Sequence, residues 1–253
     1  MARYVLQLCY IGTRYAGWQS QKNAVSVQNK IDHALSTILK QNIETIGSSR
    51  TDTGVHAKQQ FCHFDYEFPL PDTIIRQLNG ILPNDIAVQS IYQVPNDFHT
   101  RFDAIYRSYE YHVVQEKNPF WYQKSYLMNR KIDLDVMNQG AELLLQHTNF
   151  KSFCKTKSET KGYNCKLRYA YWKQTEPKHL TFYISSNRFL YGMVRAITGT
   201  LIELGENKMT LAQLQDIINA QDRKQAKYAA PAEGLFLTEV KYSCDWEKFP
   251  CWK

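Results

Sequence analysis

One short run brings a carboxylate, a guanidinium and a glycine close together, SSRTDTGVHA at residues 48 to 57. Every second position of this run carries one of these groups, at Arg50, Asp52 and Gly54, and His56 follows two positions later. Ser, Thr, Asp and Gly favour tight turns, in which an Asp side chain commonly bonds the backbone of its own turn. A carboxylate presented by a turn can also act as a nucleophile or as an electrostatic partner. The run therefore predicts a turn and leaves both roles open for Asp52.

Other catalytic patterns are absent from the sequence. It contains no P-loop, dinucleotide fingerprint, HExxH or GxSxG motif. A glycosidase would need a second carboxylate across the scissile bond, whereas Asp65 and Glu67 already fall in or beyond the next predicted strand. The cysteines form no C-x-x-C pair and no cluster with zinc spacing. We therefore expect no metal, no cofactor and no disulfide framework.

The charge distribution points to a polyanionic partner. The net charge is +7, and the segment from Lys151 to Lys178 alone contributes +6. Aromatic residues are interleaved with these charges, as in surfaces that stack nucleotide bases. A solvated lysine-rich loop would have the same composition, so the segment leaves both interpretations open. Its basic residues are Lys151, Lys155, Lys157, Lys161, Lys166, Arg168, Lys173 and Lys178.

The overall composition is that of a globular protein. The chain has 253 residues, of which 43% are hydrophobic and 22% charged. The longest uncharged apolar piece, AITGTLI, is far shorter than the roughly 20 residues that span a bilayer. The N-terminal MARYVLQLCYIGTRY alternates as a strand does, unlike a signal peptide. We expect a soluble, cytoplasmic protein without a membrane partner.

Hydrophobic periodicity predicts an alternation of strands and helices in residues 1–104. An apolar stripe follows Ser26, a plausible N-cap, and predicts a helix over 26–40. Another helix is expected at 74–82, ended by Pro83. Alternating or apolar runs predict strands at 3–10, 59–68 and 86–94.

Residues 105–253 repeat this order. Helices are predicted at 133–147, at 188–204 with Gly205 as the stop, and at 210–222; strands are predicted at 106–114, 166–174, 179–186 and 234–242. The first of these strands places Arg107, Tyr109, Tyr111 and Val113 on one face. The pattern predicts an α+β fold with two ferredoxin-like halves, 1–104 and 105–253, sharing a large, mostly antiparallel sheet around a central cleft.

Seven motifs follow one another along the chain: YIGTRYAGWQSQ (10–21), SRTDTGVHA (49–57), NGILPNDIAV (79–88), FHTRFDAIYRSYEY (98–111), HTNFKSF (147–153), RFLYGMVRAITGTLIELG (188–205) and APAEGLFLTEVKY (230–242). In this order they resemble the TruA-type tRNA pseudouridine synthases, a family with the pseudouridine synthase fold. The resemblance runs from residue 4 to residue 242 and rests on this whole set rather than on one string.

The resemblance implies a role for individual residues. Asp52 matches the catalytic nucleophile of the family, and Arg195 matches the arginine that pairs with it. Tyr109 matches the tyrosine that stacks on the target uracil, and Leu235 matches an apolar wall over that base. Arg50 matches a residue that fills the space left by the flipped nucleotide. His56 is expected to be structural or to face RNA, because the reaction does not require an imidazole.

The implied reaction is isomerisation of uridine to pseudouridine on the 3′ side of the anticodon stem-loop of tRNA. It breaks a C–N glycosidic bond and rejoins the uracil through C5 without net redox change, which suits a chain lacking cofactor motifs. The resemblance also implies a homodimer. Of the basic segment, Lys155, Lys157 and Lys161 are expected to contact tRNA. Whether Asp52 attacks the base or the sugar stays open.

Two other classes of function fit the sequence less well. A tRNA-binding or tRNA-folding protein without catalysis would not need Asp52, Tyr109 and Arg195 together. DNA binding is disfavoured because no helix-turn-helix or zinc finger is visible. Several positions depart from the usual family pattern near the turn and the expected RNA path, namely Ile11, Ser49, Thr53, Thr100 and Gly192.

Overall fold

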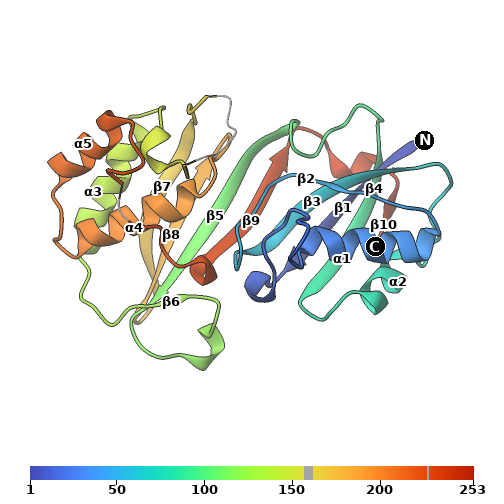
Figure 1. Cartoon of the computed structure of the whole chain (residues 1–253), viewed down its shortest axis with the longest axis horizontal. Helices are drawn as coiled ribbons and strands as arrows, with labels where there is room; N and C mark the ends of the chain where they lie inside the picture. The colour runs from blue at the N-terminus through green and yellow to red at the C-terminus, as the bar shows by residue number, and fades with distance from the viewer. Residues whose placement is uncertain (157–161, 227) are drawn as a thin grey trace. The chain divides into compact units, whose positions relative to one another are not determined.

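The computed structural model describes residues 1–156, 162–226 and 228–253 and divides the chain into two compact units (Figure 1). Unit 1 consists of residues 1–105 and 237–253, and unit 2 of residues 106–236. The predicted halves, 1–104 and 105–253, stay a prediction. Residues 237–253 group with unit 1, where Trp246 stacks on Phe61 with ring centroids 5.2 Å apart.

Unit 1 is built on strands in the order β10-β4-β1-β3-β9. The pairs β10/β4, β4/β1 and β1/β3 are antiparallel. The long strands are β1 (Ala2–Tyr10), β3 (His56–Tyr66) and β4 (Ile86–Val94). Two short strands, β2 (Ile46–Gly47) and β10 (Cys251–Trp252), pair with β3 and β4, and β9 (Leu235–Tyr242) belongs to this unit from residue 237 onward. The register places Leu6 of β1 between Cys62 and Ile91, all three fully buried.

Two helices pack in unit 1, α1 (Val27–Leu39) and α2 (Ile74–Ile81). Ser26 caps α1 as predicted, because its hydroxyl accepts from the Asn29 amide while the Asn29 side chain accepts from the Ser26 amide. The predicted stripe is buried at Val27, Ile31 and Leu35. Helix α2 contacts both α1 and β4, so the helices and the sheet enclose one core.

Unit 2 has the antiparallel order β5-β8-β7. Its strands are β5 (Ala104–Val114), β7 (Leu167–Glu176) and β8 (His179–Ser186), and the short β6 (Tyr126–Leu127) pairs in parallel with β5. The helices α3 (Leu134–Leu145), α4 (Met193–Gly205) and α5 (Leu211–Ala220) pack together, with α3 against β7 (Figure 1). The predicted α+β class, with mostly antiparallel pairing, is confirmed.

Helix α4 differs from its prediction at both ends. It begins at Met193 rather than at residue 188, because Gly192 has a left-handed φ of +70° and the Tyr191 carbonyl accepts from the Lys155 amide. Gly205 is the last helical residue rather than the stop beyond it. A Cβ at Gly205 would lie 2.5 Å from Met137, so glycine is needed there for close packing between helices.

Short 3-10 helices complete the fold at Gly12–Arg14, Pro119–Trp121, Lys151–Phe153, Ala232–Gly234 and Trp246–Lys248. The six cysteines all carry free thiols. Among the described residues, no helix has the length and apolar character needed to cross a membrane.

Candidate active site

The run around Asp52 forms the predicted turn. The Val55 amide donates to the Asp52 carbonyl at 3.1 Å, which closes a four-residue turn. Gly54 occupies its third position with a φ of +80°, a conformation that a type II turn requires and that favours glycine. The Asp-Thr-Gly sequence therefore fits this turn, with Asp52 half-buried at its first position and Arg50 exposed just before it.

Residues 11–18, called the bracing segment below, contact the turn through their backbone. The Trp18 amide donates to the Thr51 carbonyl at 3.2 Å, and the Gly54 amide donates to the Tyr15 carbonyl at 3.3 Å. Gly17 has a φ of +87°, and a Cβ there would lie 2.4 Å from the Thr51 carbonyl oxygen. Only glycine lets the two backbones approach this closely.

His56 lies directly after the turn and is fully buried. Its Nδ1 accepts from the Gly12 amide at 2.9 Å. That bond requires an unprotonated Nδ1. Through it the imidazole joins the residue after the turn to Gly12. The structural interpretation of His56 is confirmed.

Asp85, in the loop between α2 and β4, fixes the same bracing segment. Its carboxylate accepts from Arg14 Nε at 2.8 Å and from the Tyr15 hydroxyl at 2.6 Å, and its carbonyl accepts from the Ile11 amide at 2.9 Å. Burial and the bond to Asp85 raise the pKa of Tyr15, so its hydroxyl stays a donor. Three of the sequence motifs, at 10–21, 49–57 and 79–88, therefore meet in unit 1 to hold one turn.

Unit 2 carries the aromatic part of the predicted site on β5. Tyr109 is only 8% exposed, and its ring meets Phe189 edge-on, with centroids 5.2 Å apart and an interplanar angle of 89°. Tyr111 lies two residues along the same face and donates its hydroxyl to the Pro231 carbonyl at 2.9 Å. The rings are thus fixed by packing before any substrate binds.

Arg195 lies in the first turn of α4 and contacts Ala230, the neighbour of the Pro231 that Tyr111 contacts. Its Nε donates to the Ala230 carbonyl at 2.8 Å, while its own carbonyl accepts from the Ala230 amide at 2.9 Å. Close packing makes this exchange possible, since a Cβ at Gly199 would lie 2.1 Å from the Tyr228 carbonyl oxygen. The bond to Nε fixes the plane of the guanidinium, as an arginine that orients a carboxylate requires.

Leu235 is 5% exposed at the start of β9. The preceding Gly234 touches β5, because a Cβ there would lie 2.7 Å from the Tyr111 ring. Unit 2 therefore carries Tyr109, Tyr111, Arg195 and the segment 230–235, and both Tyr111 and Arg195 contact that segment. Asp52 and Arg50 belong to unit 1.

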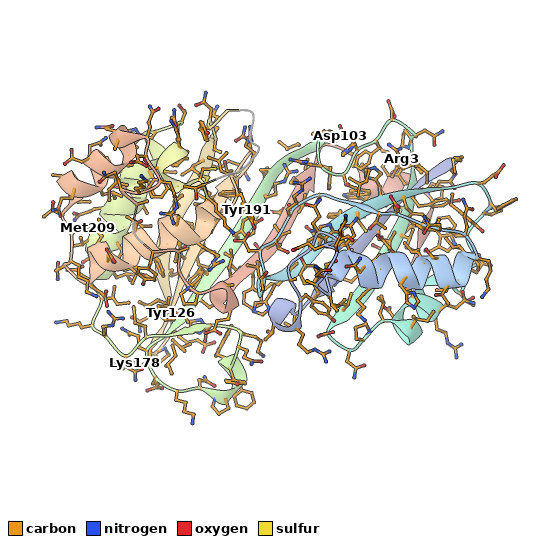
Figure 2. The ribbon with its side chains drawn as sticks, viewed as in Figure 1. Arg3, Asp103, Tyr126, Lys178, Tyr191 and Met209 are labelled. Atoms are coloured by element: carbon orange, nitrogen blue, oxygen red, sulfur yellow. The ribbon has the colours of Figure 1, made fainter. Side chains whose placement is uncertain are left out.

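The basic segment is divided among several elements. Lys155 is exposed, and its Nζ lies 4.6 Å from the centre of the Tyr191 ring. Tyr191, labelled in Figure 2, lies just before α4. Arg168 of β7 lies 3.8 Å from the centre of the ring of Tyr106 on β5. Lys157 and Lys161 lie outside the described residues. The predicted tRNA contacts of the three lysines stay predictions.

In the part of the chain that the structure describes, no group of three His, Cys, Asp or Glu side chains is arranged to hold a metal ion. Sequence reasoning missed the roles of Gly17, Tyr15 and Asp85. Their motifs were visible, but the contacts of Asp85 with residues 11–15 join segments about 70 positions apart, which a local pattern does not reveal.

Comparison with known proteins agrees with this arrangement of motifs. A family described as tRNA pseudouridine synthase matches residues 8–103 and 141–243. The tRNA pseudouridine synthase A of Porphyromonas gingivalis is 41% identical over 249 residues, covering 97% of this chain and 99% of that protein. The enzyme of the same name from Bacteroides thetaiotaomicron is 43% identical, covering 97% and 92%. That of Clostridium acetobutylicum is 36% identical, covering 96% and 100%.

These matches and the α+β fold define an isomerase with the pseudouridine synthase fold. The chain belongs to the tRNA pseudouridine synthase family. Its similarity to members named tRNA pseudouridine synthase A extends over almost its full length.

Proposed function

We propose that this protein isomerises uridine to pseudouridine in the anticodon stem-loop of tRNA, on its 3′ side, with Asp52 as the nucleophile. One observation carries the proposal. Three separate motifs of the chain converge on the turn that presents Asp52, through Gly17, His56 and Asp85. A turn that served only as a connection would not need backbone approaches this close.

The chemistry requires a carboxylate and a means of holding a detached base. Attack by the Asp52 carboxylate, at C6 of the uracil or at C1′ of the ribose, allows the glycosidic C1′–N1 bond to break. The uracil then turns and C5 bonds to C1′. The bond to Asp52 breaks, the proton on C5 leaves, and N1 takes up a proton. Atoms and electrons balance without an oxidant or reductant.

The remaining residues hold the reactants. The target nucleotide must leave its stack, which costs a few kcal/mol and needs a closed pocket. Tyr109 supplies a fixed ring for the uracil, and Leu235 an apolar wall. Arg195, with its plane set by Ala230, orients the carboxylate, and the exposed Arg50 occupies the place of the flipped nucleotide.

The proposal includes the partners. The substrate is tRNA, contacted by Lys155, Lys157 and Lys161, and the active species is a homodimer in the cytoplasm. The net charge of +7 supports the polyanionic partner.

Replacing Asp52 by Asn tests the nucleophile. Asn keeps the size and turn-forming tendency of Asp but removes the charge. We expect Asp52→Asn to abolish pseudouridine formation, mapped in tRNA after incubation with purified protein, while tRNA affinity changes little. Asp72→Asn, an exposed position of unit 1, is the matched control and should keep full activity. Turnover of Asp52→Asn within about tenfold of wild type, a loss far below the 10²–10⁴ of a single positioned group, would refute the assignment.

A further inference from the structure

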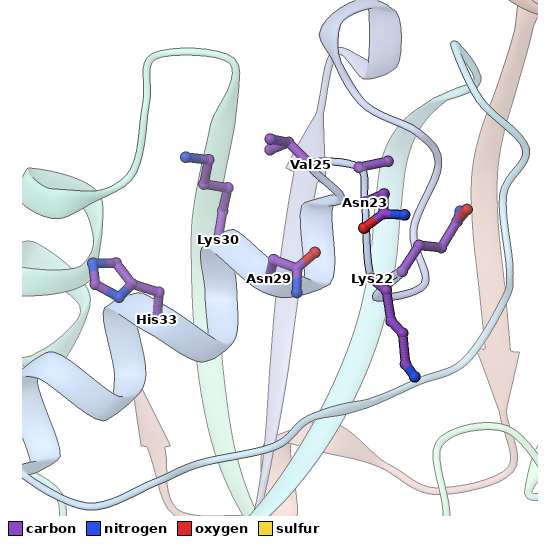
Figure 3. A pocket seen from close by; sticks show the side chains of 8 residues that line it. Lys22, Asn23, Val25, Asn29, Lys30 and His33 are labelled. Carbon is purple, nitrogen blue, oxygen red and sulfur yellow. The ribbon is translucent and has the colours of Figure 1, made fainter.

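A basic groove lies in unit 1 on the segment that leads into α1 (Figure 3). It has a volume of about 550 Å³ and is lined by eight residues. Lys22 and Lys30 lie on either side, with the side chains of Asn23 and Asn29 between them (Figure 3). The other lining residues are Gln21, Ala24, Val25 and His33.

The groove is built for an anion. None of its lining residues is acidic. The acid nearest along the helix, Asp32, is turned to another segment, since its Oδ1 accepts from the Thr45 amide at 3.0 Å and from the Thr45 hydroxyl at 2.6 Å. Lys22, Asn23 and Lys30 are all exposed and carry donors. Two lysine ammonium groups with no carboxylate among the lining residues favour phosphate oxygens over a neutral or cationic ligand.

The shape and the rim favour a polymer over a small ion. Two lysines separated by amide groups can contact successive phosphates of one strand, whereas a single small anion would reach only part of the groove. Val25, 53% exposed at the rim, offers an apolar surface that a ribose can cover. Most contacts between proteins and nucleic acids are of this backbone kind.

The groove is tied to the catalytic turn by the main chain. The Ala16 amide donates to the Val25 carbonyl at 2.9 Å, and the Val27 amide donates to the Gly17 carbonyl at 3.1 Å. The backbone of Gly17 also lies against the Thr51 carbonyl, just before the turn. The segment that lines the groove therefore also braces the turn that carries Asp52.

We propose that this groove is an RNA-backbone site that binds phosphodiesters of the tRNA substrate through Lys22 and Lys30, with Asn23 donating to a phosphate oxygen or a 2′-hydroxyl. The inference rests on the proposed function for the identity of the RNA. It adds a binding site on unit 1, whereas the basic segment belongs to unit 2.

The test is the double variant Lys22→Gln/Lys30→Gln, with Lys40→Gln as the matched control at the opposite end of α1. Binding of unmodified tRNA is titrated at several salt concentrations. Each lost phosphate contact lowers the slope of log affinity against log salt by roughly 0.7 to 0.9, so the double variant should lose about 1.4 to 1.8. The control should keep the wild-type slope, and the charge reversal Lys22→Glu/Lys30→Glu should weaken binding further.

The catalytic step separates this inference from the proposed function. At saturating tRNA, the double variant should convert uridine with the wild-type single-turnover rate, since it loses only binding. An unchanged affinity and salt slope would overturn the groove as an RNA site, and so would normal binding with a reduced catalytic rate. Failure of the wild-type protein to form pseudouridine would instead overturn the proposed function, while the binding comparison would still decide whether the groove holds RNA.

Discussion

At the scale of single residues, the ring and the hydroxyl of Tyr109 have separate roles in the proposed reaction. The ring is locked edge-on against Phe189 and is 8% exposed, so it provides a preformed surface for a flat base. The hydroxyl is the candidate group for removing the proton from C5 after the uracil has turned. Substitutions that keep or remove the ring distinguish these roles.

We expect Tyr109→Phe to form the new C–C bond and then stall, because the ring remains while the proton acceptor is lost. Denaturing gels with 5-fluorouridine tRNA should show an adduct or a rearranged, unreleased base, and single-turnover release should fall by about 10²–10⁴-fold. Tyr109→Leu should lose roughly 1 to 3 kcal/mol of base stacking as well. Tyr171→Phe, on an exposed part of β7, serves as the control. A Phe variant with wild-type kinetics would leave Tyr109 as a stacking surface alone.

At the scale of elements, the turn at 52–55 owes its shape to backbone contacts with residues 12–18. Gly17 makes one of these contacts and has a left-handed φ of +87°. An alanine there would be strained both by its backbone angle and by the Thr51 carbonyl.

Gly17→Ala should therefore destabilise unit 1 by about 2 kcal/mol, the cost of a left-handed non-glycine residue, with any relief of the clash moving the turn. Because that turn carries Asp52, we expect the single-turnover rate to fall more than about tenfold even where the variant is fully folded. Circular dichroism melts and single-turnover assays measure the two effects. Gly80→Ala is the control, since nothing lies within 4 Å of a Cβ there, and it should be neutral or slightly stabilising. A Gly17→Ala protein with normal activity would contradict the bracing role.

The same elements show what local sequence can predict. Ser26 and the stripe after it predicted α1 correctly, because a cap and a 3.6-residue period are local properties. The ends of α4 were predicted wrongly, because the need for glycine at 205 comes from Met137 on another helix. The turn around Asp52 was predictable from its residue types, whereas its bracing by Asp85 depends on tertiary contacts.

At the scale of the whole molecule, the stability of the fold depends on a carboxylate outside the proposed site. Asp32 of α1 is half-buried, and burial raises the pKa of its carboxyl to about 6, an effect that the two hydrogen bonds from Thr45 only partly oppose. The folded state thus binds a proton more tightly than the unfolded chain does. Stability from this group is fully present below about pH 4 and is lost as the pH rises through about 6.

Asp32→Asn removes this titration while keeping an oxygen that accepts from Thr45. We expect the variant to be more stable than wild type above pH 7 by about 1 to 2 kcal/mol, allowing for solvent screening of a half-buried group. The two proteins should converge towards pH 4. Urea unfolding at a series of pH values gives the two free energies. A variant less stable than wild type at pH 7.5 would show that the bonds from Thr45 prefer the carboxylate.

Unit 1 is made of two stretches of the chain, 1–105 and 237–253, and this determines which unit can fold first during synthesis. Residues 106–236 form one contiguous compact unit, so they can fold as soon as they have left the ribosome. Unit 1 must wait, since β9 pairs with β3 and Trp252 of β10 pairs with Ile91 of β4. The unit that presents Asp52 is therefore completed only once residues 237–252 have been made, so a chain cut short before residue 237 would keep an unfinished sheet around the turn that carries Asp52.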